Sequence, residues 1–278
     1  MLTEKLQKSY PSLTKQQKKV AEFFLSHGPE AAFLSVAQLA QQVKTSQASV
    51  VRFSRAIGFP GYLELRQELQ NLVKQKISPS KVLRNLIGRE AKANLYAKIF
   101  QMDLQNLSET QEASQPETLD RAVKEIICAR RIGFVGLRGS HAIAYLLYYF
   151  LGRVRKNCEL LEDGSNLTNQ LINYGGKDLL VGISFPRYSR QTLEILKYGK
   201  KEGCKIMAIT DTPISPIGQV ADFTLLAQPK SATYFNSFTS AVTLVNCLVS
   251  GVSLKSKRSL ETLNSFDQID TEWKYFLI

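Results

Sequence analysis

Five short, mostly apolar runs in the second half of the chain leave few possible folds. Segments with the periodicity and length of helices separate them, notably 141–154 and 190–202, and a closing helix is expected at 236–249. The runs span residues 132–135, 159–161, 178–184, 205–210 and 223–226. Apolar strands that alternate with helices are typical of a parallel sheet covered on both faces. The second half is therefore predicted to be an α/β sandwich.

Polar loops follow three of these strands, where a parallel sheet binds its ligands. The loop 136–140 combines glycines, which let a backbone approach closely, with a cation and a hydroxyl at a helix start, a combination suited to an anion. The loop 184–190 gathers three hydroxyls and two guanidiniums, which suit a phosphorylated or carboxylated sugar-like ligand. The third loop is 210–213. The candidate ligand-binding residues are Gly136, Arg138, Gly139, Ser140, Ser184, Arg187, Ser189 and Arg190.

Ordinary turn chemistry explains part of the same pattern. The glycines also suit a tight strand-to-helix turn, and Ser189 also suits the cap of the next helix. The first loop is not a Walker A loop, because no Gly-Lys-Ser/Thr follows, and Val135 stands where a dinucleotide fingerprint needs a glycine. No cofactor is therefore expected. His141 is the one imidazole beside these loops, and such a histidine is more often structural, so no catalytic residue is assigned.

The first eighty residues read as helices separated by short breaks. Capping boxes mark helix starts at Thr14 and Ser35. The second helix is short and amphipathic, and the two-residue connection 44–45 then leads to Ser46, which caps a third helix running to Ile57. A short helix, a tight turn and a helix that starts with small polar residues form a helix-turn-helix pattern.

The third helix has two different faces. Val50, Phe53 and Ile57 are expected in the core, whereas the other faces carry small, hydroxylic or cationic side chains. Small side chains let a helix approach DNA bases, Arg can bond guanine, and Ser or Gln can reach base edges or phosphates. The candidate DNA-binding residues are Lys44, Thr45, Ser46, Gln47, Ser49, Arg52 and Arg55. A helical bundle with a merely solvated polar face would give the same pattern.

Length and charge agree with this division. The chain has 278 residues, which suggests two domains, and a formal net charge of +12. Residues 1–80 hold 11 Lys and Arg against 5 Asp and Glu, so half of the positive excess lies in less than a third of the chain. A basic small segment favours an anionic partner, with nucleic acid first and a membrane surface second.

The predicted organisation is a helix-turn-helix domain over 1–77, a helical linker over 78–116 and the α/β domain over 117–278. Within the linker, helical sequence reaches about Leu107 and a polar stretch covers 108–116. Four scattered cysteines and two histidines predict no metal site and instead apolar core thiols in a reducing compartment. Without a signal core or an apolar run long enough to span a bilayer, the protein is expected to be cytoplasmic with no membrane partner.

Both halves together resemble the RpiR family of bacterial transcriptional regulators. In the first half the resemblance rests on the segments Leu13-Thr14-Lys15, Ser35-Val36-Ala37-Gln38-Leu39-Ala40, Ser49-Val50-Val51-Arg52-Phe53 and Gly58-Phe59-Pro60-Gly61-Tyr62. In the second half it rests on Ile132-Gly133-Phe134-Val135-Gly136 with Gly139-Ser140, on Ile183-Ser184-Phe185-Pro186-Arg187-Tyr188-Ser189-Arg190, and on Ile209-Thr210-Asp211. The order and spacing of these segments make the match specific.

The resemblance implies an all-α helix-turn-helix domain followed by a sugar isomerase (SIS) domain, a parallel-sheet sandwich of flavodoxin-like topology. It also implies a regulator that binds a double-stranded DNA operator, senses a phosphosugar or related sugar-acid metabolite, controls carbohydrate-metabolism genes and forms a homodimer or homotetramer. Ser140 and Ser184 match the family's loop serines. Many SIS domains continue the second loop with Ser and Gly, whereas Phe185-Pro186-Arg187 stands here, and proline removes a backbone N–H from any phosphate cradle.

Two other functions remain open on the sequence. A sugar-phosphate isomerase would use the helical domain for assembly, but isomerisation needs an acid or base near the sugar carbons, and neither candidate ligand loop holds Asp or Glu. An assembly module without any ligand is the third reading. The expectation is a regulator and not an enzyme.

Overall fold

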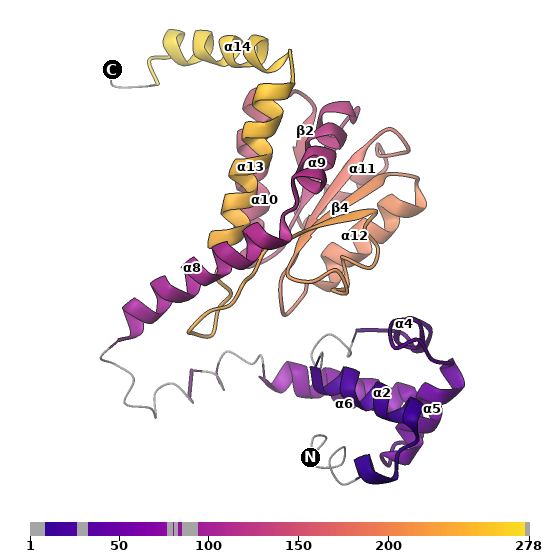
Figure 1. Cartoon of the computed structure of the whole chain (residues 1–278). Coiled ribbons are helices and arrows are strands. Elements are labelled where there is room, and N and C mark those ends of the chain that lie inside the picture. Colours follow the sequence, from indigo (N-terminus) through magenta and orange to yellow (C-terminus); the bar gives the residue numbers. More distant parts are fainter. Residues whose placement is uncertain (1–8, 27–32, 77–79, 81–82, 85–93, 276–278) are drawn as a thin grey trace. The chain divides into compact units, whose positions relative to one another are not determined.

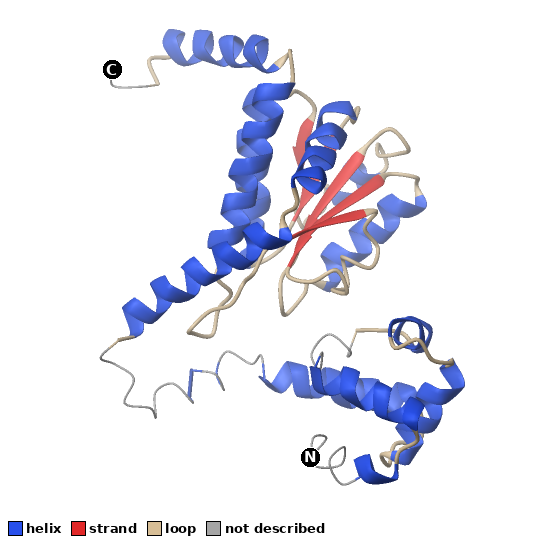
Figure 2. Cartoon of the chain, viewed as in Figure 1, coloured by secondary structure: helices blue, strands red, loops and turns tan. Residues whose placement is uncertain are grey.

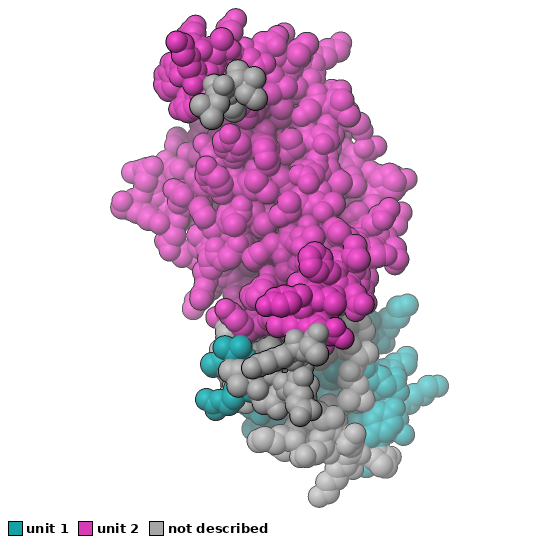
Figure 3. Space-filling model, turned by 90° about the vertical axis from the view of Figure 1, so that its left-hand side faces the viewer, with its two compact units in different colours: residues 1–88 teal, residues 89–278 magenta. Residues whose placement is uncertain are grey.

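The computed structural model describes residues 9–26, 33–76, 80, 83–84 and 94–275 (Figure 1). Contacts between residues divide the chain into two compact units, 1–88 and 89–278, coloured separately in Figure 3. The predicted boundary at residue 77 lies outside the described residues. Among the described residues, no helix is both long and apolar enough to cross a membrane.

The N-terminal unit is helical, as predicted. A 3₁₀ turn, η1, precedes four α-helices, and the described elements are η1 Tyr10–Ser12, α2 Lys15–Ser26, α4 Val36–Gln42, α5 Gln47–Ala56 and α6 Tyr62–Lys76. Both predicted capping boxes form: Thr14 exchanges bonds with Gln17, and Ser35 does so with Gln38. The Phe53 ring of α5 stacks on Phe24 of α2 with centroids 5.6 Å apart, so α5 is anchored by its apolar face.

The C-terminal unit is built on five parallel strands, and all five were predicted. They are β1 Ile132–Val135, β2 Cys158–Leu160, β3 Leu179–Ile183, β4 Lys205–Thr210 and β5 Phe223–Leu226. Their order in the sheet is β2-β1-β3-β4-β5, with every neighbouring pair parallel. This is the flavodoxin-like order, whose strand sequence reverses between β1 and β3.

Helices cover both faces of this sheet (Figure 2). One face packs against α9 Pro116–Cys128, α10 Gly139–Val154 and α13 Thr239–Lys255, and the other against α11 Leu167–Leu171 and α12 Arg190–Lys201. Side chains alternate between the two cores along each strand, because successive residues of a strand point to opposite faces. In β3, Val181 enters the first core and Leu180 the second.

Two local expectations were wrong, and two helices were missed. The polar stretch from Ser108 continues a helix, since α8 spans Leu95–Ala113 and buries Thr110. The short α11 and the final helix α14, Ser259–Glu272, were not predicted, because neither carries a strong apolar stripe. Of the four cysteines, which all have free thiols, Cys204 is buried but Cys128 and Cys247 are exposed, so these two are not core residues.

Candidate functional site

The connection before α5 is a tight turn with an unusual residue in it. Lys44 has a left-handed backbone, with φ of 53°. The Thr45 N–H donates to Ala40 O at 2.8 Å and the Lys44 N–H to Gln41 O at 3.1 Å, which together form a Schellman motif at the end of α4. Glycine is the usual residue there, as Gly58 is after α5. The exposed Lys44 side chain therefore stands beside the start of α5.

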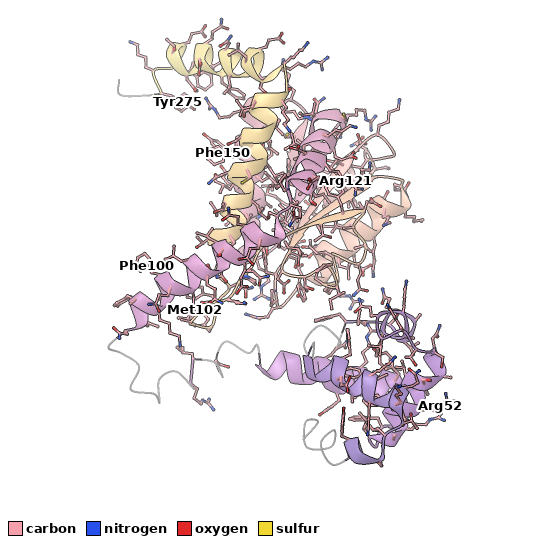
Figure 4. The ribbon with its side chains drawn as sticks, in the orientation of Figure 1. Arg52, Phe100, Met102, Arg121, Phe150 and Tyr275 are labelled. Atoms are coloured by element: carbon pink, nitrogen blue, oxygen red, sulfur yellow. The ribbon has the colours of Figure 1, made fainter. Side chains whose placement is uncertain are left out.

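Hydroxyl groups organise the first turn of α5. Ser46 caps the helix by accepting the Ser49 N–H at 3.2 Å, and the two hydroxyl oxygens lie 2.9 Å apart. A terminal guanidinium nitrogen of Arg52 donates to Ser49 Oγ at 3.2 Å, so the buried Ser49 orients the exposed Arg52 side chain. Figure 4 shows Arg52 projecting from α5. Ser46 and Ser49 thus shape the helix start, while Gln47 is exposed.

The surface of α4 and α5 has only positive charge. No Asp or Glu occurs between Ser35 and Leu63, a segment that includes Lys44, Arg52 and Arg55. Arg55 donates from Nε to Pro60 O at 3.2 Å, which fixes its stem at the end of the helix. Exposed cations without acidic neighbours on a helix-turn-helix attract DNA phosphates.

In the C-terminal unit, the first candidate loop turns sharply from β1 into α10. A Cβ on Gly136 would lie 2.6 Å from Ser140 O, so the turn needs a glycine there. Arg138 precedes α10 with φ of 57° and an exposed side chain. The Ser140 hydroxyl makes no hydrogen bond to any described residue. The loop therefore offers a hydroxyl, a cation and a helix amino terminus at one place.

The second candidate loop follows β3 and is shaped by its own serines. Buried Ser184 accepts the Ser189 N–H at 3.1 Å, and Ser189 caps α12 by accepting the Thr192 N–H at 3.2 Å. Arg187 has φ of 74°, a region that favours glycine, and its side chain is exposed. Arg190 begins α12 and is exposed as well.

A third segment, which sequence reasoning missed, joins the two loops. We call residues 228–239, which connect β5 to α13, the strap. Asn236 donates to Pro186 O at 3.1 Å, and the Phe238 ring packs edge-on against Phe185 with centroids 5.6 Å apart. A Cβ on Gly139 would lie 3.2 Å from the Phe238 ring. The loops after β1 and β3 therefore share one neighbour at the switch point of the sheet.

Acid–base groups near the loops are engaged elsewhere. His141 Nε2 lies 3.7 Å from Glu162 Oε1, a contact that is an ion pair only when the imidazole is protonated. The Tyr188 hydroxyl donates to both carboxylate oxygens of Asp211, at 2.9 and 3.0 Å, which ties the third loop to the second. Within the described part of the chain, no three His, Cys, Asp or Glu side chains gather as metal ligands would.

Two family models match the two halves of the chain. Residues 1–76 match the helix-turn-helix domain of the rpiR family, and residues 125–251 match the SIS domain. The transcriptional regulator HexR of Pseudomonas aeruginosa is 28% identical over 263 residues, which cover 91% of this chain and 90% of HexR. RpiR of Escherichia coli is 24% identical over 225 residues, covering 80% of this chain and 74% of RpiR. Both names agree with the expectation of a regulator and not an enzyme.

Solved structures give the same picture. The sugar isomerase domain of an RpiR transcription factor from Sphaerobacter thermophilus is 32% identical with a TM-score of 0.60, and the match covers 63% of this chain and 99% of that domain. The NanR protein of Vibrio vulnificus, solved in complex with ManNAc-6P, is 20% identical with a TM-score of 0.69 over 98% of this chain and 99% of NanR, and so shares the fold. With its helix-turn-helix, its SIS domain and these relatives, the chain belongs to the RpiR family of transcriptional regulators.

Proposed function

We propose that this regulator senses a phosphosugar or a related sugar acid between the loops after β1 and β3 and controls carbohydrate-metabolism genes. The observation that carries this proposal is the set of three exposed guanidiniums on the two loops that flank the switch point of the sheet, one of which also carries Ser140. Arg138, Arg187 and Arg190 make no ion pair with any described residue. The amino termini of α10 and α12 add partial positive charge there.

An anionic ligand fits this charge, and the neighbouring hydroxyl suits a sugar oxygen or a phosphate oxygen. The phosphosugar bound by NanR, a protein of the same fold, belongs to the same chemical class. Because Ser184 and Ser189 hold the second loop in shape, Arg187 and Ser140 are the residues that we expect to contact the ligand directly.

Calorimetric titration with phosphosugars, the matching unphosphorylated sugars and sugar acids tests this site. Arg187→Ala and Ser140→Ala are expected to weaken binding at least tenfold, since each removes a hydrogen bond to a charged group. Lys201→Ala, which removes an exposed cation at the far end of α12, serves as the matched control. Equal binding by wild type and the Arg187 variant would exclude this site.

We further propose that α5 reads an operator made of two half-sites, with the seven residues from Lys44 to Arg55 named above at the interface. Selection from random DNA supplies the operator fragment. Arg52→Ala is expected to weaken binding and relax selectivity at one base pair, because a bidentate Arg–guanine contact discriminates by about 1–3 kcal/mol. Lys19→Ala, on the exposed side of α2, is the control. Unchanged affinity and selectivity at fixed salt would remove Arg52 as a reader.

Two half-sites require two copies of the chain, and we propose that α8 contributes to their contact. Its Tyr96, Phe100 and Leu104 are 79, 74 and 67% exposed and recur every four residues, so they form one apolar stripe. Figure 4 shows Phe100 on this helix. Phe100→Glu is expected to shift the sedimentation coefficient toward the monomer, whereas Gln101→Glu, next to it but off the stripe, leaves the assembly intact. A Phe100 variant that sediments as wild type would contradict this contact.

A further inference from the structure

The strap is held in place by one face of α8. Asp103, Asn106 and Thr110 are spaced so that they lie on this one face, and all three contact the strap. Glu109 lies beside them and also contacts the strap. Asp103 accepts the Ser237 hydroxyl at 2.5 Å and the Thr239 hydroxyl at 3.0 Å, one on each carboxylate oxygen. These two bonds fix the end of the strap that leads into α13.

The other bonds fix the beginning of the strap. Asn106, which is fully buried, donates to Lys230 O at 2.7 Å, and Thr110 Oγ1 accepts the Gln228 N–H at 2.9 Å. The Lys230 ammonium lies 2.6 and 2.7 Å from the two oxygens of Glu109. Buried polar groups are costly to leave unpaired, so the strap and α8 are expected to move together.

The same strap touches both candidate ligand loops. Its Asn236 holds the Pro186 carbonyl and its Phe238 packs against Phe185 and beside Gly139. Contacts run without a gap from α8 through the strap to the loops after β1 and β3. Among the described elements, only α8 and α9 lie along the chain between the N-terminal unit and the first strand, and α8 comes first.

We propose that α8 is a positioning element of the effector site and carries its occupancy toward the DNA-binding unit. Asp103, Asn106 and Thr110 would act through the strap, without touching the ligand. Along the chain, α8 is the next described helix after α6 of the helix-turn-helix unit. A change in the loops that moves the strap would therefore also move α8, and with it the end of this unit that is joined to the helix-turn-helix. This role rests on the effector site proposed above.

Hydrogen exchange of the full chain without any ligand tests the positioning role. Asp103→Ala breaks both bonds to the strap and improves the helix propensity of α8, so it should leave the helix itself intact. We expect exchange in 184–190, reported by the Ser189 N–H, to accelerate about tenfold, as for the loss of a charge-assisted hydrogen bond. Glu112→Ala, which removes an exposed carboxylate from the same helix, should leave that rate unchanged.

Ser237→Ala removes the shorter of the two bonds from the strap side and stands in if the Asp103 variant does not fold. Faster exchange that is confined to α8 and the strap, with 184–190 unchanged, would overturn the positioning role. This experiment needs no effector, so it tests the positioning role of α8 even if every phosphosugar fails to bind.

A second arm uses ManNAc-6P and inorganic phosphate as probes. In wild type, a bound probe should slow exchange in 184–190 and also in α8; in Asp103→Ala it should slow only the loop. Protection of the loop without any change in wild-type α8 would refute the transmission and leave the effector site standing. Absence of protection in 136–140 and 184–190 would instead count against the effector site.

Discussion

Three cations of the two proposed sites have a positive φ, which residues with a Cβ rarely adopt. Lys44, Arg138 and Arg187 have φ of 53°, 57° and 74°. For an L-residue with a Cβ, the left-handed region costs roughly 1–2 kcal/mol, and such residues cluster at functional sites because the surrounding structure has to hold them there. Each stands in a turn where a glycine would be free of this strain, so each retains its charged side chain at an expense in stability.

Lys44 allows strain and function to be separated. We expect Lys44→Gly to raise the free energy of unfolding of the N-terminal unit by about 1 kcal/mol or less, because glycine relieves the left-handed strain but adds freedom to the unfolded chain. The same change should weaken operator binding and lower the salt slope of log K by about 1, as for one lost phosphate contact. Urea denaturation and a binding titration at several salt concentrations measure the two effects.

Lys44→Ala is the matched comparison, since it removes the same charge and keeps the Cβ. It should weaken DNA binding as much as glycine does and give no gain in stability. Equal stabilities of the two variants would mean that the turn stores no strain at this residue.

The buried carboxylate of Asp178 makes stability depend on acid pH. Burial alone would raise the pKa of Asp178, but hydrogen bonds from Arg130, at 2.6 and 2.9 Å, and from the Gly175 N–H at 2.8 Å outweigh it, so the pKa lies below its ordinary value. A group whose folded pKa is depressed stabilises the fold above its unfolded pKa, near 4, and loses that contribution as pH falls toward the folded pKa.

Asp178→Asn should therefore destabilise the C-terminal unit by about 1–3 kcal/mol at neutral pH, the cost of weakening a buried, charge-assisted network. Solvent screens part of the effect, because the Arg130 side chain is 57% exposed. Denaturation measured from pH 7 down to pH 3 should show wild type and variant converging as pH drops. Curves that stay parallel over that range would remove Asp178 as the source of the acid sensitivity.

At the scale of elements, α12 lies so close to β3 that a glycine is required between them. A Cβ on Gly199 would sit 2.1 Å from Cδ1 of Leu180, a side chain that is fully buried in the core between this helix and the sheet. We expect Gly199→Ala to destabilise the unit by about 1–3 kcal/mol through overpacking. Gly199 lies near the carboxyl end of α12, so that end is affected first. Ser189 and Arg190 of the candidate ligand loop lie at the opposite, amino end.

Leu180→Val removes the clashing methyl and provides the rescue. The cost of Gly199→Ala, measured by urea denaturation, should be smaller in the Leu180→Val background than in wild type, with a coupling of at least about 0.5 kcal/mol. Strictly additive costs would show that the helix moves away from the sheet instead of pressing on Leu180.

The elements that the sequence predicted are those encoded by neighbours in the chain. The capping box at Ser35 and the cap at Ser46 are local signals, and the apolar strands follow from the burial of both sheet faces. The strap and the carboxyl end of α8 were missed because their bonds are nonlocal: Asp103 and Ser237 are 134 residues apart, and Thr110 is polar yet buried. The cap at Ser189 was one of two readings of the sequence and is confirmed, whereas the bond by which Ser184 accepts the Ser189 N–H is visible only in the fold.

At the scale of the whole molecule, the two compact units have separate hydrophobic cores. Each unit has its own fully buried apolar side chains, such as Leu39 in the first and Leu147 in the second. Separate cores favour two thermal transitions in calorimetry rather than one. Leu39→Ala should lower only one transition and Leu147→Ala only the other, each by the equivalent of about 2–5 kcal/mol.

With the transitions assigned, ligands should act on them selectively. Operator DNA at 100 times its Kd should stabilise the Leu39 transition by about 2.7 kcal/mol, and a phosphosugar at the same excess should stabilise the Leu147 transition by as much. If the units are coupled through α8, DNA and phosphosugar together should shift the two transitions by amounts that differ from the sum of their separate shifts, and the difference is the coupling free energy between the sites. Purely additive shifts would mean that the effector does not regulate DNA binding within one chain. A single transition that is lowered by both core variants would mean that the two units unfold together.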